Sequence, residues 1–282
     1  MKLPPRLRRL GFGLSTTLGL AQRGFFIPFR HADRLPPPGR TDAYPAIAAL
    51  MAARREAFSD LLVEFARHRE AFARFDGAEP PLPRWGQDWF PRLDAAAAYA
   101  LVARHRPRRI VEVGSGHSTR FMARAVIDGG FDCDFTAIDP QPRADIARLP
   151  VRHIQMAVQN APQAIFATLE AGDVLFIDSS HVLMPGTDVD LLFGTVLPAL
   201  PPGVLVHIHD IFLPDDYPAA WTWRGYNEQQ GVFGLLAGGW APLWSSRYVA
   251  TRMAAEVAAS RAGELPLTPG AWETSLWLRR EG

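Results

Sequence analysis

The sequence predicts an α/β fold with a mostly parallel sheet, and two patterns predict it. From Arg109 onward, apolar runs of about five residues alternate with helical segments, as in strand–helix–strand units. The runs hardly alternate between polar and apolar residues, which is typical of strands covered on both faces. The composition, 48% hydrophobic and 21% charged, is that of an ordinary globular chain.

The expected elements can be placed in order along the chain from residue 93. Strands are expected at residues 109–113, 131–139, 151–158, 173–178, 203–211, 241–251 and 273–280. Helices are expected at residues 93–105, 118–130, 143–149, 161–172, 188–201 and 226–239. The last two strands alternate better than the others, so we expect them to close the sheet as an antiparallel pair.

Residues 1–92 are expected to form an arm and a helical cap before the sheet domain of residues 93–282. Apolar residues recur at helical spacing over residues 44–74. The stretch RLRRLGFGLSTTLGLA begins basic and is mildly apolar. Three interpretations of it stay open: a packing arm, a weakly membrane-associated amphipathic segment, or a weak signal peptide. No window approaches the ~20 apolar residues of a membrane span.

Charge and cysteine content exclude several classes of protein. A formal net charge of +1 gives no field for nucleic acid or for an anionic membrane. Cys133 is the only cysteine, which rules out an intramolecular disulfide and a thiolate zinc cluster, and we expect it to pack. We expect a cytoplasmic protein. Phe25, Phe26 and Phe29 in the arm are candidate contacts for a homo-oligomer.

A glycine turn follows the first expected strand in the stretch IVEVGSGHSTRF. Gly114 and Gly116 permit a tight turn and the close approach of a ligand to the backbone, and the next helix offers free N–H groups. Asp139 ends the second strand, where a carboxylate can accept both hydroxyls of a ribose. A lone G-x-G motif also occurs in NAD-binding Rossmann domains, so that alternative stays open.

At these motifs the chain resembles the class I S-adenosylmethionine-dependent methyltransferases. The stretches VEVGSGHST, AIDP, DVLFIDSSH and GVLVHIHDIFLPDDYP are similar to those of bacterial metal-dependent O-methyltransferases that act on sugars of macrolide antibiotics. The resemblance covers about residues 85–280. It implies a Rossmann-like, doubly wound seven-stranded sheet of order 3-2-1-4-5-7-6 with the last strand antiparallel, preceded here by a helical extension. The acid before the glycines and the closing strand pair favour this class over an NAD-binding domain.

The resemblance also implies where S-adenosylmethionine binds. Asp139 would hold the ribose, and Gln159 and Asn160, after the third strand, would lie near the adenine. The methionine end would be held by residues of the glycine turn and the helix start that follows it: Glu112, Gly114, Ser115, Gly116 and Ser118.

Polar residues also end the fourth and fifth expected strands. The apolar run Val174 to Ile177 stops at Asp178, with His181 three residues later, and the fifth strand ends in His209 and Asp210. Ligands of open α/β sheets bind beyond the carboxyl ends of the strands. We therefore expect these four polar side chains to meet in one pocket.

Methyl transfer to oxygen needs a hydroxyl that is losing its proton, which a divalent cation and a base both assist. Asp178 and Asp210 suit Mg²⁺, and His181 suits the base. The resemblance implies this same arrangement, with an acid where His209 stands. We therefore expect Asp178, His209 and Asp210 as metal ligands, with Mn, Fe or Zn as alternatives to Mg. A third ligand from elsewhere stays open, with Asp215, Asp216 and Glu228 as candidates.

The remaining histidines and the rim carry weaker expectations. His207 lies deeper in the fifth strand and is expected to be structural, and His117 to be non-catalytic. Trp221, Trp223 and Tyr226 follow the fifth strand without periodicity, so stacking on the acceptor and packing of a lid are equally open. The segment 84–90 is expected to fold over the cofactor.

These patterns predict an S-adenosylmethionine-dependent O-methyltransferase. The acceptor would be a hydroxyl of a small molecule, a sugar or a natural product, with a divalent metal and His181 as general base. Two alternatives stay open: a metal-independent methyltransferase of the same fold, and a catalytically silent cofactor-binding or interaction module. A hydrolase of the G-x-S-x-G type is excluded because the motif is missing, and nucleic-acid binding lacks a basic patch.

Overall fold

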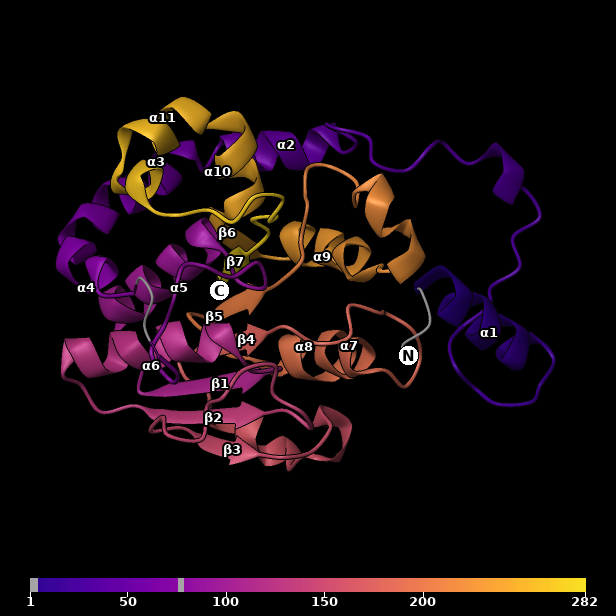
Figure 1. The fold of residues 1–282 in the computed structure, drawn as a ribbon, viewed down its shortest axis with the longest axis horizontal. Coiled ribbons are helices and arrows are strands. Elements are labelled where there is room, and N and C mark those ends of the chain that lie inside the picture. Colours follow the sequence, from indigo (N-terminus) through magenta and orange to yellow (C-terminus); the bar gives the residue numbers. More distant parts are fainter. Residues whose placement is uncertain (1–4, 76–78) are drawn as a thin grey trace.

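The computed structural model describes residues 5–75 and 79–282, and a seven-stranded sheet forms its centre. The strand order β3-β2-β1-β4-β5-β7-β6 confirms the predicted topology (Figure 1). The strands are β1 (Arg109–Val113), β2 (Asp134–Ile138), β3 (Arg152–Ile154), β4 (Val174–Ile177), β5 (Leu205–Ile208), β6 (Trp240–Ser245) and β7 (Leu276–Arg280).

The pairing pattern places the reversal of strand order between β1 and β4. β1 pairs in parallel with β2 on one side and with β4 on the other. β4 continues in parallel to β5, whereas β7 runs antiparallel to both β5 and β6. The carboxyl ends of β1, β4 and β5 therefore share one edge of the sheet, which is where ligands of such folds bind.

The central strands form because their apolar side chains are buried on both faces. All four residues of β4 and all four of β5 are buried. Phe176 is fully buried, and burying a side chain of this size contributes about 2–3 kcal/mol relative to exposing it. The same rigid strands hold the residues that follow Ile177 and Ile208 at fixed positions on the shared edge.

Helices surround the sheet, and two of them lie side by side over its first half (Figure 1). α5 packs against α6, while α3 and α9 both contact β6. The α-helices are α1 (Pro5–Thr17), α2 (Pro45–Ala52), α3 (Arg55–Glu64), α4 (Arg69–Ala73), α5 (Arg92–His105), α6 (His117–Gly129), α7 (Asp188–Leu191), α8 (Leu197–Ala199), α9 (Glu228–Ala237), α10 (Ser246–Arg252) and α11 (Ala254–Ala259). A π-helical stretch, Leu192–Val196, connects α7 to α8.

Several expected elements differ from the structure. The helix expected over residues 44–74 is divided into α2, α3 and α4, and the one over 161–172 is a 3-10 helix at Gln163–Thr168. No helix forms over residues 143–149. The strand expected to reach residue 251 ends at Ser245, whose hydroxyl accepts a hydrogen bond from the Tyr248 N–H at 3.2 Å and so caps α10.

The cap helices share the core of the sheet, whereas α1 stands away from it (Figure 1). Phe58 of α3 and Phe65 pack on Trp244 of β6, with ring centroids 6.1 and 5.8 Å from the Trp244 ring. The arm, residues 7–40, lies outside this core and is mostly exposed. Within residues 5–75 and 79–282, the helices all fall short of the length and apolar content that crossing a bilayer demands.

Candidate active site

Gly114 sets the geometry of the glycine turn after β1. Its φ is +81°, and a Cβ atom there would lie 1.8 Å from the backbone oxygen of Asp178. Beside it, the Asp178 N–H donates to the oxygen of Val113 at 2.8 Å. Only glycine allows this close approach, so the turn after β1 lies directly against the residue that ends β4. Gly116 is different, because a Cβ there would meet its first neighbour at 3.5 Å.

Glu112 of β1 is fully buried beneath the turn. Its carboxyl group accepts hydrogen bonds from the hydroxyls of Ser118 at 2.6 Å and Thr119 at 2.7 Å. Burial raises the pKa of Glu112 to about 8, and the two hydroxyl bonds only partly oppose this. In the absence of a ligand, Glu112 is therefore largely neutral at pH 7 and holds the start of α6 in place.

Asp139, just after β2, holds the other side of the turn. Its Oδ2 accepts from the Ser115 N–H at 2.6 Å and from the Ser115 hydroxyl at 3.0 Å, and its Oδ1 accepts from the Gln141 N–H at 2.7 Å. The predicted adenine contacts, Gln159 and Asn160, are exposed in the 3-10 turn Val158–Asn160 that follows β3. The turn residues and Asp139 thus form one cluster, with Gln159 and Asn160 beyond the adjacent strand.

The ends of β4 and β5 bring the predicted polar group together around one imidazole. The Nε2 atom of His181 lies 3.3 Å from Oδ1 of Asp178 and 3.5 Å from Oδ2 of Asp210. Its Nδ1 atom lies 2.8 Å from Oε2 of Glu228, the first residue of α9. Parallel strands deliver Asp178 and Asp210 to the same edge, which explains why the apolar run of β4 ends in charged residues. We name this set, Asp178, His181, Asp210 and Glu228, the acid–imidazole cluster.

The cluster holds its charges by mutual pairing in a dry environment. Burial alone would lower the pKa of His181, but the contacts with Asp178 and Glu228 and the charge of Asp210 raise it well above 6.5. Burial would likewise raise the pKa of Asp178, yet the charge of His209 and the contact with His181 hold it below its usual range. The ring of His181 is therefore protonated at neutral pH in the unliganded protein.

Two members of the cluster adopt left-handed backbone conformations. The φ of His181 is +61° and that of Asp210 is +54°. This region costs a non-glycine residue about 1 kcal/mol or more, and such residues gather at functional sites. The chain therefore accepts local backbone strain at both strand ends to direct these two side chains toward each other.

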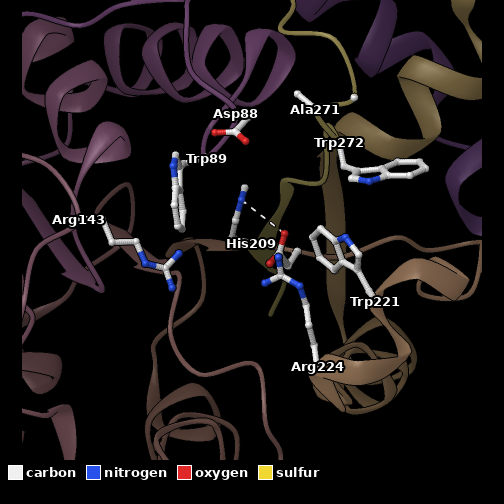
Figure 2. Close-up of a pocket in the computed structure, with 10 residues that line it drawn as sticks. Asp88, Trp89, Arg143, His209, Trp221, Arg224, Ala271 and Trp272 are labelled. Carbon is white, nitrogen blue, oxygen red and sulfur yellow. Dashed lines mark ion pairs between the residues drawn. The ribbon is translucent and has the colours of Figure 1, made fainter. Parts of the chain in front are cut away.

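A cavity of about 230 Å³ opens beside the cluster (Figure 2). His209 lies between Trp89 on one side and Trp221 and Trp272 on the other, with Nε2 3.7 Å from Oδ1 of Asp210. The full lining is Asp88, Trp89, Arg143, His209, Asp210, Trp221, Arg224, Gly270, Ala271 and Trp272. The segment 84–90 thus contributes to one wall of the cavity, and Trp221 to the other.

His181 is further from this cavity than the sequence predicts. Its side chain is 2% exposed, and the ring of Tyr226 lies over it at a centroid distance of 4.6 Å. Asp210 and His209 are the members of the predicted set that line the cavity. An acceptor in the cavity therefore meets Asp210 and His209, whereas the ring of Tyr226 lies against His181.

The predicted divalent cation does not fit this arrangement of side chains. Within residues 5–75 and 79–282, no group of three or more His, Cys, Asp and Glu side chains is placed to hold a metal ion. The Nε2 atom of His181 lies within 3.5 Å of both Asp178 and Asp210, so the imidazole itself pairs with two of the predicted ligands. The ligand set Asp178, His209 and Asp210 therefore lacks structural support.

The alternative third ligands are engaged elsewhere, except for Glu228. Asp215 pairs with Arg247 and Arg252, and Asp216 pairs with Arg40 at 2.7 Å. The sequence suggested Glu228 as a metal ligand. In the structure Glu228 contacts Nδ1 of His181, whereas Asp178 and Asp210 contact Nε2. No sequence pattern indicates this contact, because α9 follows β5 by a long irregular segment.

Two further buried groups complete the surroundings. His207 stacks on Phe176 at 3.7 Å, with its Nε2 2.8 Å from the Ser275 hydroxyl, and burial lowers its pKa well below 6.5, in line with a structural role. Asp94 of α5 was missed by sequence reasoning. It accepts from the backbone N–H groups of Thr274 and Ser275, and burial raises its pKa to about 6. The sequence pattern that could have indicated Asp94 is its position as the one acid in an Ala-rich helix.

Comparisons with known proteins agree with this fold. Residues 111–211 match the model of a family described as a methyltransferase domain. No curated protein sequence matches the chain significantly. Among solved structures, the chain is similar to the SAH-bound methyltransferase PaMTH1 of Podospora anserina, at 16% identity and a TM-score of 0.43, over 92% of this chain and 100% of that one.

Two other solved structures are similar at the same level. The O-methyltransferase TomG of Streptomyces achromogenes, involved in tomaymycin synthesis and solved with SAM, has 18% identity and a TM-score of 0.40, over 85% of this chain and 97% of that one. An O-methyltransferase of Bacillus cereus in complex with SAH has 18% identity and a TM-score of 0.38, over 65% and 82%.

The match over residues 111–211 supports the predicted enzyme class, an S-adenosylmethionine-dependent methyltransferase.

Proposed function

We propose that the protein transfers the methyl group of S-adenosylmethionine to a hydroxyl of a small molecule, with His181 as general base and without a divalent cation. The observation that carries this proposal is the acid–imidazole cluster. An imidazole held by Asp178, Asp210 and Glu228 lies at the strand ends next to the glycine turn. A sugar or natural-product hydroxyl is the proposed acceptor group.

The proposed reaction moves one methyl group and one proton. The bond between sulfur and the methyl carbon breaks as the bond between that carbon and the acceptor oxygen forms, with the three atoms in line. Because the resting ring of His181 is protonated, it must first lose a proton to solvent. The hydroxyl proton then passes to the neutral Nε2 atom of His181, and the neutral thioether leaves. The carboxylates of Asp178 and Asp210 then stabilise the imidazolium, because both lie within 3.5 Å of that nitrogen.

The cavity supports a small, flat acceptor. Its volume of about 230 Å³ lies below the usual ~300–1,000 Å³ of drug-sized sites, so it suits a single ring or one end of a larger molecule. Trp89, Trp221 and Trp272 provide apolar surfaces for such a ring. The guanidinium of Arg224 stacks 4.2 Å from the Trp221 ring, which keeps that indole oriented at the rim.

His209 is the competing base, because its ring lines the cavity whereas His181 is covered by Tyr226. Turnover of S-adenosylmethionine with a panel of phenols and hydroxylated sugars, measured for His181→Ala and His209→Ala, separates the two. We expect His181→Ala to lower kcat by about 10²–10⁴-fold. His209→Ala should cost less than about tenfold, and the reverse order would assign the base to His209. Calorimetric binding of S-adenosylmethionine should be unchanged in both variants.

A chelator titration tests the metal-assisted alternative. We expect full activity after treatment with EDTA, because the imidazole of His181 already neutralises the two carboxylates. Loss of activity that Mg²⁺ or Mn²⁺ restores would support the metal-dependent reading instead. Binding of S-adenosylmethionine without turnover of any acceptor in the panel would favour the silent cofactor-binding module.

A further inference from the structure

Large apolar side chains are exposed along the N-terminal arm at a density found nowhere else in the described residues. The described residues include twenty large apolar residues that are exposed, and eleven of these lie between residues 7 and 35, with 41–76% of their surface exposed. Contiguous exposed apolar surface of this kind marks a contact with a partner or a membrane. The eleven are Leu7, Leu10, Phe12, Leu14, Leu18, Leu20, Phe25, Phe26, Ile27, Phe29 and Leu35.

The helix of the arm is amphipathic. In α1, Leu7, Leu10 and Leu14 recur at spacings of three and four residues, so they share one face. Arg8 and Arg9 fall on the opposite face, and all five side chains are exposed. The arginine face also carries Phe12, whose ring lies 5.3 Å from the Arg8 guanidinium. A helix with one leucine face and one face bearing arginines suits the boundary between water and lipid headgroups.

The charge of the arm differs in sign from that of the rest of the chain. Residues 1–40 contain eight Lys and Arg and a single acid, Asp33. The remaining 242 residues contain 22 Lys and Arg against 28 Asp and Glu. The net charge of +1 is therefore the sum of a basic arm and an acidic body.

The arm meets the body around residues 39–44 and again in α1, where Arg9 donates to the oxygen of Thr222 at 3.5 Å, and its apolar residues stay exposed (Figure 1). Arg40 pairs with Asp216, and the Tyr44 N–H donates to the oxygen of Pro214 at 3.2 Å. A Cβ at Gly39 would lie 2.9 Å from the backbone of Ala219, so the arm leaves the body in close contact. These contacts hold the C-terminal end of the arm against the body without covering the apolar surface of the arm.

We propose that the arm docks the protein on the surface of an anionic phospholipid bilayer. The arginines would pair with the headgroups while the leucine face of α1 and the Phe25–Phe29 segment enter the acyl boundary. The basic charge of the arm suits anionic headgroups, and the scatter of apolar side chains on the body favours this occupant over a second copy of the chain. On the body, the other nine exposed large apolar residues are spread from Leu50 to Trp272 and offer single side chains to a docking arm.

Vesicle flotation with the full chain tests the proposal. We expect binding to vesicles of phosphatidylcholine mixed with phosphatidylglycerol, little binding to pure phosphatidylcholine, and weaker binding as salt rises. Arg8→Gln with Arg9→Gln should lower the partition coefficient by about 30-fold. The matched control removes two exposed arginines of the body, Arg67→Gln with Arg279→Gln, and should bind like the wild type.

A second variant tests the apolar part. Phe25→Ser with Phe26→Ser should lower partitioning by at least about tenfold, whereas Val63→Ser, at a 72% exposed position of α3, should not. Circular dichroism and the melting temperature should match the wild type, because the arm lies outside the core. Equal binding by the arm variants and the wild type would overturn the proposal. So would a dimer in light scattering that the arm variants abolish while vesicles stay unbound, since the occupant would then be a second copy.

Discussion

Two clusters of buried acids lie along the same edge of the sheet, and the pKa values of their carboxyl groups are shifted in opposite directions. Beneath the glycine turn, Glu112 is bonded by two hydroxyls, and burial raises its pKa to about 8. At the β4–β5 corner, Asp178 lies against the imidazole of His181, and its pKa is lowered. Hydroxyl donors leave a buried acid neutral, whereas a protonated imidazole keeps it charged.

The difference teaches where chemistry can occur along this edge. The turn is a neutral, hydrogen-bonded frame whose main requirement is shape, as the contact between Gly114 and Asp178 demonstrates. The acid–imidazole cluster lies next to the cavity at the ends of β4 and β5, and its imidazole can hold or release a proton.

The largest effect is expected from Gly114→Ala, which attacks the shape of the turn. A Cβ atom would lie 1.8 Å from the backbone oxygen of Asp178, and φ of +81° is unfavourable for alanine. We expect a loss of at least about 4 kcal/mol in the free energy of unfolding, measured by urea denaturation. Gly116→Ala is the matched control, because its Cβ would meet only ordinary contacts at 3.5 Å, and its loss should be clearly smaller. Equal losses would contradict the assigned close approach.

Glu112→Gln changes the charge of the frame without changing its shape. An acid whose pKa is raised from 4.5 to about 8 binds more protons in the folded state between those values. The cofactor-free protein therefore loses stability as pH rises from 4.5 to 8. Glutamine removes this dependence, so between pH 4.5 and pH 8 the free energy of unfolding of the variant should rise relative to that of the wild type by roughly 4 kcal/mol. Melting temperatures across this range measure it, and parallel curves for the two proteins would refute the raised pKa.

Glu228→Gln weakens the corner at the far side of the imidazole. Losing one of three carboxylates lowers the pKa of His181, so the rise of kcat with pH should move to lower pH by about one unit. The plateau of kcat should fall by about tenfold because the ring is held less firmly. Gln230→Ala, an exposed neighbour on α9, should change neither. A lower plateau with an unmoved pH profile would mean that Glu228 serves structure alone.

Much of the sheet was predictable because its strands are continuous apolar runs that have few other stable arrangements. The strand order came from the resemblance, and the structure confirms it. Helix boundaries were harder. The prolines near residues 140, 142 and 150 leave turns where a short helix was expected, and the Ser245 hydroxyl converts the end of an expected strand into the start of α10.

At the site, sequence order along parallel strands was enough to bring Asp178, His181 and Asp210 together. It could not reveal that the imidazole would lie between the carboxylates, since that depends on backbone angles at single residues. It also could not place Glu228, because contacts across a long irregular connection leave no periodic signal. The assigned roles of these residues, and those of Gln159 and Asn160 toward adenine, stay predictions.

The left-handed φ values at His181 and Asp210 also limit what can replace them. Glycine, asparagine, aspartate and histidine tolerate this conformation, while β-branched and most larger residues resist it. Few residue types are therefore tolerated at either position in any redesign of the acid–imidazole cluster. In a mutant library that randomises both positions without this restriction, most variants would fold poorly, whatever acceptor they were meant to methylate.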